Sequence, residues 1–305
     1  MSDRHVIVGA GPVGRNVAAL LAERGSEVVV ATRSGTDLGI SGVASARVDA
    51  TDVTALAEAA AGASVLYNCA NPGDYTQWDA TWPPLAAALL EAARRTGARY
   101  AITGNLYPYG PVDGPMTEQL PDAATDHKGV LRARLWADAL AAHEAGEVRS
   151  VEVRGSDYMG TGVGVNGHIS RLIPGARAGR RAWVLGDPDM PHTFTDVQDV
   201  ARLLIAAAED ESALGRVWHV PSNPPRSQRQ ALGGVLAAAG IASVPVTRIP
   251  PLAVRLGGLA VPMLRELDQL SYQWTRPYVL DDSAARAHFG IEPTPWAEVC
   301  RRTAL

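Results

Sequence analysis

The sequence predicts an α/β fold, a doubly wound parallel sheet with a smaller C-terminal lobe, and three observations support this prediction. Short apolar runs alternate with longer helical patterns over residues 4–154. The first run ends in a glycine-rich turn, and an Ala/Leu-rich helical pattern follows it as far as Gly25. Beyond Gly155 the elements are short and interrupted by prolines. Alternating strands and helices are typical of a parallel sheet with helices on both faces.

The glycine-rich turn has the spacing Gly9-x-Gly11-x-x-Gly14. Gly9 permits a sharp turn out of the strand, Gly11 has no Cβ to block a pyrophosphate, and Gly14 allows the helix to pack closely on the sheet. The helix that starts at Pro12 and Val13 offers free backbone N–H groups of its first turn, from Val13 onward, to phosphates. With a strand before it and a helix after it, the pattern indicates dinucleotide binding.

The second predicted strand, residues 27–31, ends in Thr32, Arg33 and Ser34. NAD-binding chains of this fold usually place Asp or Glu here to hold the ribose 2′-OH. A guanidinium group instead pairs with a phosphate through parallel hydrogen bonds, so Arg33, with Arg15 beside the last glycine, favours a 2′-phosphate. We therefore expect NADPH (NADP) as the cofactor, with a solvated surface role as the alternative for either arginine.

Further apolar runs complete the predicted sheet, at residues 46–52, 64–70, 99–103 and 148–154. Long helical patterns are predicted at residues 77–96 and 128–143. Ligands of such sheets lie beyond the carboxyl ends of the strands. Three more residues are therefore expected beside the cofactor: Asp49, Ala70 and Asn71.

These patterns divide the chain into two parts. Residues 1–155 form the predicted Rossmann dinucleotide-binding core. Residues 156–305 form mainly a substrate-binding lobe, with residues 192–220 returning to the core sheet. Two helix starts in the second part fit capping boxes, one beginning at Thr195 and the other at Ser227.

Composition narrows the class of protein. The 305 residues are 47% hydrophobic, with a formal net charge of -4, so no basic field favours nucleic acid or an anionic membrane. Two cysteines, Cys69 and Cys300, predict neither a disulfide framework nor a metal site. We expect a cytoplasmic enzyme that acts on a small molecule, as a monomer or as a homodimer paired through the long helices.

Several segments together resemble the extended and atypical short-chain dehydrogenase/reductases, the NAD-dependent epimerase/dehydratase family. These segments are residues 9–14, 68–70, 154–160, 192–201 and 281–290. The resemblance covers nearly the whole chain. It implies a nicotinamide cofactor and a substrate cleft between core and lobe.

Members of that family carry a Ser or Thr after the fifth strand and a Tyr-x-x-x-Lys on the next helix. By this resemblance, Thr103 supplies the hydroxyl and Lys128, the only lysine of the chain, holds the cofactor ribose. Ala124 stands four residues before Lys128, where the family has its proton-relaying tyrosine. The catalytic tyrosine is therefore missing, and alanine cannot donate a proton in its place.

Two explanations compete for this departure: a non-catalytic NADP-binding regulator, or a reductase with another proton source. We favour an NADPH-dependent ketoreductase of a hydrophobic, aromatic polyketide-type substrate, as in antibiotic biosynthesis and other secondary metabolism. A phenol or enol of that substrate would assist its own reduction. The candidate hydrogen-bond donors are Thr103, Asn105, Tyr107, Tyr109, His127, Tyr158 and His192. The residues expected to stack on substrate, or else to form ordinary core, are Met159, Trp183, Met190 and Trp274.

A nucleotide-sugar epimerase or dehydratase is the other enzyme class that the resemblance implies. A nucleoside diphosphate needs cations in the lobe. The candidates for such a basic cluster are Arg171, Arg177, Arg180 and Arg181.

Overall fold

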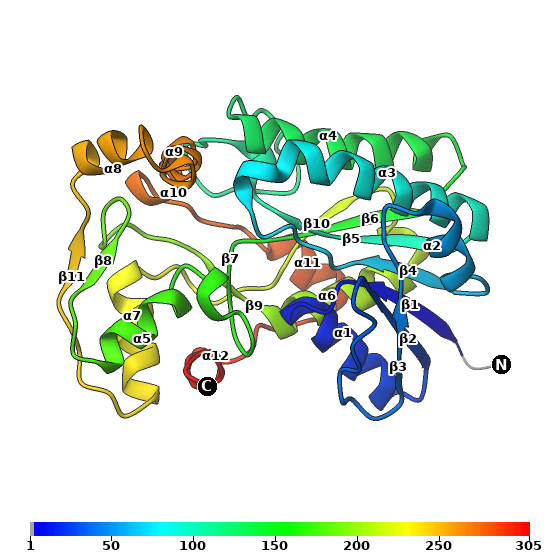
Figure 1. The fold of residues 1–305 in the computed structure, drawn as a ribbon, viewed down its shortest axis with the longest axis horizontal. Helices are drawn as coiled ribbons and strands as arrows, with labels where there is room; N and C mark the ends of the chain where they lie inside the picture. The colour runs from blue at the N-terminus through cyan, green and yellow to red at the C-terminus, as the bar shows by residue number, and fades with distance from the viewer. Residues whose placement is uncertain (1–2) are drawn as a thin grey trace.

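A computed structural model describes residues 3–305, and its centre is a single parallel sheet (Figure 1). The sheet has seven strands in the order β10-β6-β5-β4-β1-β2-β3. Their bounds are β1 Arg4–Val8, β2 Glu27–Thr32, β3 Val43–Arg47, β4 Val65–Asn68, β5 Arg99–Asn105, β6 Ser150–Gly155 and β10 Val217–His219. The order reverses direction at β1, as in doubly wound sheets. The predicted α/β Rossmann class is confirmed.

Helices cover both faces of this sheet because its inner strands are apolar on both faces. On one face Ile7 and Val65 pack with the helices α1 (Pro12–Glu23), α6 (Val197–Glu209) and α11 (Ser283–Phe289). The other face, with Val6 and Leu66, is covered by α2 (Val53–Ala59), α3 (Trp78–Thr96) and α4 (His127–Glu144). Alternate residues of one strand therefore belong to two separate cores.

The lobe lies beyond the carboxyl edge of the sheet and has a core of its own, which includes Met159, Ile173 and Leu232 (Figure 1). Its strands are β7 Asp157–Met159, β8 Ala182–Val184, β9 Phe194–Asp196 and β11 Val246–Arg248. Its helices are α5 Ile173–Arg177, α7 Gln228–Ala238, α8 Pro251–Gly258, α9 Pro262–Gln269, α10 Tyr272–Thr275 and α12 Trp296–Thr303. Single 3-10 turns lie at Tyr75–Gln77, Tyr107–Tyr109, Gly164–Asn166, Ser170–Leu172 and Glu211–Ala213.

The segment that returns to the core begins in the lobe at β9. From there α6 packs on α1, and β10 then pairs in parallel with β6. Among the described residues, no helix is both long enough and apolar enough to cross a lipid bilayer.

Two local predictions are wrong, and both errors come from polar side chains that bond to the backbone. The third strand is Val43–Arg47, not residues 46–52, because Asp49 accepts a hydrogen bond from Thr51 N and turns the chain toward α2. Thr195 does not cap α6. Asp196 accepts from Gln198 N instead. The capping box at Ser227 is confirmed.

Candidate functional site

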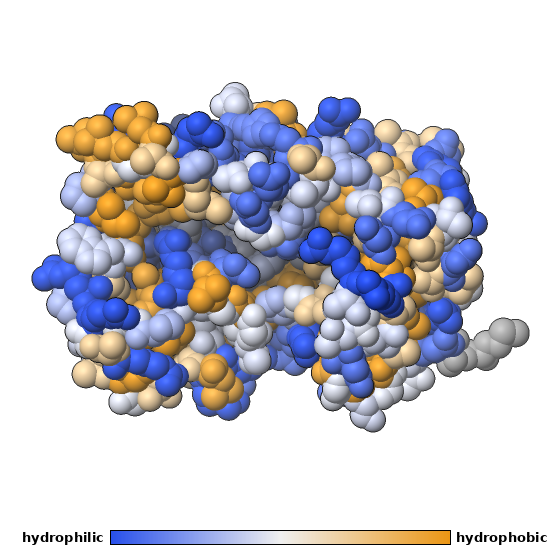
Figure 2. Space-filling model, in the orientation of Figure 1, coloured by the Kyte–Doolittle hydropathy of each residue, from blue (hydrophilic) through white to orange (hydrophobic). Residues whose placement is uncertain are grey.

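A cavity of about 720 Å³ lies where the core strands end and the lobe begins. Its core wall is built from residues that follow the strands, among them Gly9 after β1, Arg33 after β2 and Ala70 after β4. The opposite wall comes from Asp157, Tyr158 and the lobe. Figure 2 shows the molecular surface hollowed between the two parts. Parallel sheets bind ligands at this edge.

The glycine-rich turn leaves open space in the cavity where a phosphate would bind. Gly9 has φ +105° and a Cβ there would lie 2.7 Å from Cys69 O, so only glycine fits. A Cβ on Gly14 would lie 2.0 Å from Gly9 O, which shows how closely α1 packs on the turn. A Cβ on Gly11 would meet no atom within 4 Å. Gly11 and Pro12, at the N-terminus of α1, line this space and fit a bound pyrophosphate.

Most of the residues expected beside the cofactor line the cavity: Gly9, Gly11, Pro12, Val13, Thr32, Arg33, Asp49, Ala70 and Asn71. Hydrogen bonds from the backbone and side chain of Thr51 lower the pKa of Asp49, so its carboxylate is ionised. Gly14, Arg15 and Ser34 lie outside the cavity wall. Arg15 donates to Leu38 O, and Ser34 Oγ accepts from Thr36; their expected contact with the cofactor stays a prediction.

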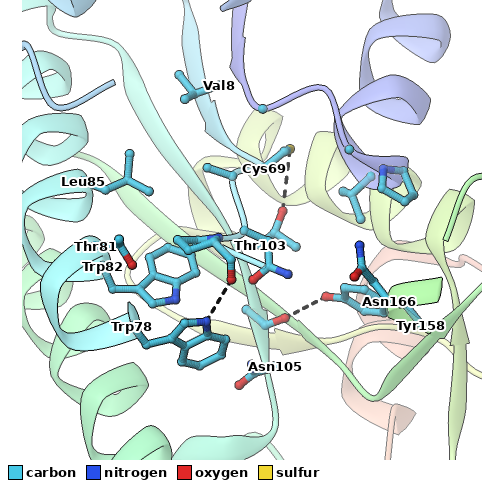
Figure 3. A pocket seen from close by; sticks show the side chains of 18 of the residues that line it. Val8, Cys69, Trp78, Thr81, Trp82, Leu85, Thr103, Asn105, Tyr158 and Asn166 are labelled. Atoms are coloured by element: carbon cyan, nitrogen blue, oxygen red, sulfur yellow. Dashed lines mark hydrogen bonds between the residues drawn. The ribbon is translucent and has the colours of Figure 1, made fainter. Parts of the chain in front are cut away.

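At the other end of the cavity the predicted hydroxyl groups are bonded to the protein. Thr103 Oγ1 donates to Cys69 Sγ at 3.7 Å, and Tyr158 donates to Gly104 O at 2.7 Å (Figure 3). The hydroxyls of Tyr107 and Tyr75 pair at 2.9 Å. Burial raises the pKa of Tyr158 and of Tyr107. These phenols therefore remain protonated and suit hydrogen bonding better than proton donation.

Lys128 does not line the cavity, which corrects its predicted place. Its ammonium contacts the carboxylate of Glu266 on α9, and the side chain is 1% exposed. The Nζ atom lies 5.5 Å from the ring centroid of Tyr75. Because α4 begins at His127, Ala124 precedes the helix and cannot share a helical face with Lys128.

Arg132, one turn after Lys128 on α4, is the cation that lines this end of the cavity. It is 4% exposed, its Nη2 donates to Thr103 O at 3.0 Å, and its guanidinium lies 4.4 Å from the Trp82 ring centroid. Its Nε has no hydrogen-bond partner among the described residues. Arg132 lies four residues after Lys128, so the two side chains could have been expected on one face of the helix. The many arginines of this chain made this single position hard to recognise.

Three residues expected to bind substrate are buried away from the cavity wall. Tyr109 is 2% exposed and its hydroxyl pairs with His219 Nε2 at 2.8 Å. Met159 is 0% exposed in the lobe core. His192 is 1% exposed and stacks on the Trp274 ring at 4.5 Å. The expectation of direct substrate contact is corrected for all three, whereas Asn105 does line the cavity.

The other expected stacking and donor residues also lie elsewhere. Trp183 is 51% exposed on the outside of the lobe, and the imidazole of His127 pairs with Asp79 at 2.8 Å. The predicted basic cluster is not formed, since Arg171 contacts His168 and Arg177 donates to Ala304 O. Along the described cavity wall the cations are Arg33 and Arg132.

The cavity is lined by an aromatic wall that was not predicted from the sequence. Tyr75 stacks on Trp78 at 4.5 Å, and Trp78 meets Trp82 edge to face at 6.0 Å. Figure 3 shows Trp78, Trp82 and Leu85 on one side of the cavity, facing Tyr158 and Asn166. The spacing of these aromatic residues along the start of α3 was the signal in the sequence.

The chain is similar to a known protein family. A family model described as "NAD dependent epimerase/dehydratase family" matches residues 5–220. No curated protein sequence matches the chain significantly.

Solved structures with the same fold include three bacterial proteins. A putative epimerase from Burkholderia cenocepacia is 22% identical, with a TM-score of 0.78 over 99% of this chain and 97% of that chain. A dTDP-glucose 4,6-dehydratase from Bacillus anthracis, in complex with NAD, is 14% identical, with a TM-score of 0.79 over 99% and 96%. A UDP-glucose 4-epimerase from Thermus thermophilus, also with NAD, is 18% identical, with a TM-score of 0.77 over 99% and 97%.

At these identities the structural neighbours show the fold, while the family model covers most of the chain, including the glycine-rich turn and the cavity wall as far as β10. The chain therefore belongs to the NAD dependent epimerase/dehydratase family.

Proposed function

We propose that the protein is an NADPH-dependent ketoreductase that reduces a carbonyl group on a hydrophobic, aromatic substrate of polyketide type. Family membership supports a nicotinamide dinucleotide and chemistry of the oxidoreductase or epimerase kind. The observation that carries the finer proposal is the continuity of the cavity. It runs from the glycine-rich turn at Gly11 to an aromatic wall formed by Tyr75, Trp78 and Trp82.

The residues of the core end fit the cofactor. The backbone around Gly11 and Pro12 would hold the pyrophosphate, and Arg33 would pair with the 2′-phosphate of NADPH. When bound there, the nicotinamide supplies a hydride. Thr103, Asn105 and Arg132 lie at the opposite end, where the reacting part of a substrate would be held.

Arg132 is suited to stabilise the reaction. As the carbonyl carbon gains a C–H bond, the C=O π electrons move onto oxygen, and a positioned cation or hydrogen-bond donor stabilises that charge. The guanidinium of Arg132 lines this end of the cavity, where its Nη2 donates to Thr103 O at 3.0 Å. The proton that completes the alcohol comes from a phenol or enol of the substrate, and water later restores it. No tyrosine lies on α4 to act as the acid.

The aromatic wall selects the substrate class. Indole and phenol rings stack on flat aromatic ligands and contribute more than aliphatic groups of equal area. Trp78 and Trp82 are each 2% exposed and pack behind Tyr75 and Arg132, so the partly exposed ring of Tyr75 is the part of this wall that a ligand would contact. A planar ring would lie between this wall and Tyr158.

A nucleotide-sugar epimerase or dehydratase is the second candidate, because the family contains such enzymes. A sugar nucleotide carries a diphosphate, which is normally bound by several cations. Beyond Arg33, which we assign to the cofactor, the described cavity wall offers Arg132 and the opposing carboxylate of Asp157. This charge distribution favours the ketoreductase. The third candidate is a non-catalytic regulator, which would bind NADPH but turn over no substrate.

One set of assays separates these functions. We expect NADPH to bind more tightly than NADH, and a hydroxylated aromatic ketone to consume one NADPH for each alcohol formed. Absorbance at the nicotinamide band, with product analysis, measures both. Conversion of a sugar nucleotide without net NADPH consumption would support the epimerase instead. Tight NADPH binding with no turnover of any carbonyl compound would support the regulator.

A further inference from the structure

The helix α8 and the residues just after it expose large apolar side chains, which we call the α8 patch. Its members are Leu252, Leu256, Leu259 and Val261, which are 66%, 57%, 85% and 47% exposed. They make up half of the large apolar side chains that are exposed in the described part of the chain. Figure 2 shows these apolar groups gathered at the upper left, over α8. Contiguous apolar surface of this kind marks a site of interaction.

The spacing of the leucines explains why they are exposed together. Leu252, Leu256 and Leu259 recur at i, i+4 and i+7, so they share one face of α8. Val254, on the opposite face, is 8% exposed and packs with Leu185 and Trp274 in the lobe. One face of α8 therefore attaches the helix to the lobe, and the leucine face is left to solvent.

Arginine side chains border the α8 patch. Arg248, at the end of β11, and Arg255, on α8, are exposed and line a second cavity of about 280 Å³. Among the described residues of that cavity's wall, Asp268 is the one acid. Residues 212–265 contain six arginines and no acidic residue, although the whole chain has a net charge of -4. Apolar groups beside local positive charge are typical of segments that lie on anionic lipid.

A second copy of the chain fits this face less well than lipid does. In a two-fold dimer the same patch meets itself, so Arg255 would approach the arginines of the other copy. Residues 212–265 hold no carboxylate that could separate these like charges, and such a juxtaposition is costly. An anionic bilayer instead offers acyl chains to the leucines and phosphates to the guanidinium groups, whose stems can lie along the lipid.

We infer that the α8 patch binds the surface of a bilayer that contains anionic phospholipids. The three leucines of α8 enter the boundary between headgroups and acyl chains, and Arg248 and Arg255 contact the headgroup phosphates. The net charge of the whole chain did not favour a membrane partner, but the field of a bilayer acts only within about a Debye length, so the local charge decides. The inference concerns binding alone and holds whichever reaction the large cavity performs.

Cosedimentation of the full chain with vesicles tests this inference. One vesicle preparation is pure phosphatidylcholine, and the other contains equal parts of phosphatidylcholine and phosphatidylglycerol. We expect the partition coefficient to be at least about tenfold larger for the anionic vesicles, because each arginine near an anionic surface contributes about fivefold. Raising NaCl to about 0.5 M should remove most of this difference, since salt screens the charges. No binding to the anionic vesicles, or equal binding to both preparations, would overturn the inference.

The double variant Leu256→Gln/Leu259→Gln removes the apolar contact and alters only exposed side chains. We expect its Tm to equal that of the parent and its partition coefficient for anionic vesicles to fall about tenfold or more, because two apolar side chains no longer leave water. Leu305→Gln, at an 89% exposed position after α12, is the matched control and should bind like the parent. An unaltered partition coefficient in the double variant would refute the inference.

The charged part of the contact has its own variant. Arg255→Ala should lower the partition coefficient about fivefold and make it less sensitive to salt. Arg301→Ala, at a 61% exposed position on α12, is the matched control and should keep both properties of the parent. If the two arginine variants lose binding equally, the net charge of the chain is responsible and the assignment to α8 is wrong.

Analytical ultracentrifugation without lipid separates the bilayer from a second copy as the occupant. We expect the parent and Leu256→Gln/Leu259→Gln to have the same oligomeric state. A parent dimer that the double variant dissociates would show that the α8 patch joins two copies, and would overturn the inference. None of these measurements uses cofactor or substrate, so failure of the proposed ketoreductase leaves their outcome unaffected.

Discussion

At the scale of single residues, the two cations of the cavity wall differ in exposure, and we propose different roles for them. Arg33 is exposed at the end of β2, beside the predicted 2′-phosphate, and Arg132 is buried beside Thr103 at the substrate end. A surface guanidinium can exchange one anion for another at small cost, whereas a buried one needs a partner that matches it. In the function we propose, the same residue type sets cofactor choice at one end and stabilises charge at the other.

Replacing Arg33 by Asp tests cofactor choice. We expect Arg33→Asp to lose the preference for NADPH over NADH, because a carboxylate repels the 2′-phosphate and accepts the 2′-OH hydrogen bond. Fluorescence titration with both cofactors measures the ratio of Kd values. Arg15→Ala serves as the control and should keep the preference, since Arg15 lies outside the cavity wall. A variant Arg33→Asp that still prefers NADPH would place the phosphate contact elsewhere.

Removing Arg132 tests charge stabilisation. We expect Arg132→Ala to lower kcat by about 10²-fold, the loss typical of one oxyanion donor, and Arg132→Lys to recover part of it. Steady-state NADPH oxidation measures the effect. Arg134→Ala is the matched control, because that side chain is exposed on the same helix. Unchanged kcat in Arg132→Ala would exclude this residue from the reaction.

At the scale of elements, two glycines of the turn between β1 and α1 have different roles. Gly14 allows the helix to pack on the turn, and Gly11 leaves space for a ligand. Gly14→Ala would bring a Cβ to 2.0 Å from Gly9 O, so we expect a loss of about 1–3 kcal/mol in the free energy of unfolding. Gly11→Ala meets no atom within 4 Å and should leave stability unchanged while weakening NADPH binding. Urea unfolding and cofactor titration on both variants check this. Equal stability of the two variants would contradict it.

The pair Lys128–Glu266 joins the core helix α4 to the lobe helix α9. Both side chains are largely buried, at 1% and 13% exposure, so removing one charge leaves the other unpaired. We expect Glu266→Gln to cost about 3–5 kcal/mol of stability. Glu147→Gln breaks the exposed pair with Arg94 and should cost less than about 1 kcal/mol. If chemical denaturation shows equal losses, the buried pair is not a structural link.

At the scale of the whole molecule, two buried histidines make stability depend on pH. Burial lowers the pKa of His219 to about 4 and that of His168 to about 3, from the usual 6.5. The unfolded chain therefore binds these protons at higher pH than the folded one, and stability falls as pH drops below about 6.5. Burial also raises the pKa of Asp196 to about 6 and raises that of Glu118, which act in the opposite direction, while it lowers the pKa of a third histidine, His5.

We therefore expect the urea midpoint to decrease steadily between pH 6.5 and pH 4, with the buried histidines outweighing Asp196 and Glu118. Urea titrations across this range measure the slope. His219→Gln should have a shallower slope than the parent, and His127→Gln, at an exposed position, should keep the parent slope. A midpoint that stays constant over this range would show that these imidazoles do not control acid stability.

The sequence by itself determined the parallel sheet class, the glycine-rich turn and the capping box at Ser227, because the patterns that indicate them each lie within short stretches of the chain. The turn is set by the space around Gly9 and Gly14, and apolar runs form buried strands wherever they lie. Tertiary structure alone decided which side chains reach the cavity. Arg132 lies there and Lys128 does not, because α9 arrives from far along the chain and covers the lysine. Asp157 and Gln273 share a wall only once the lobe has folded, since no local pattern records contacts between residues so distant in sequence.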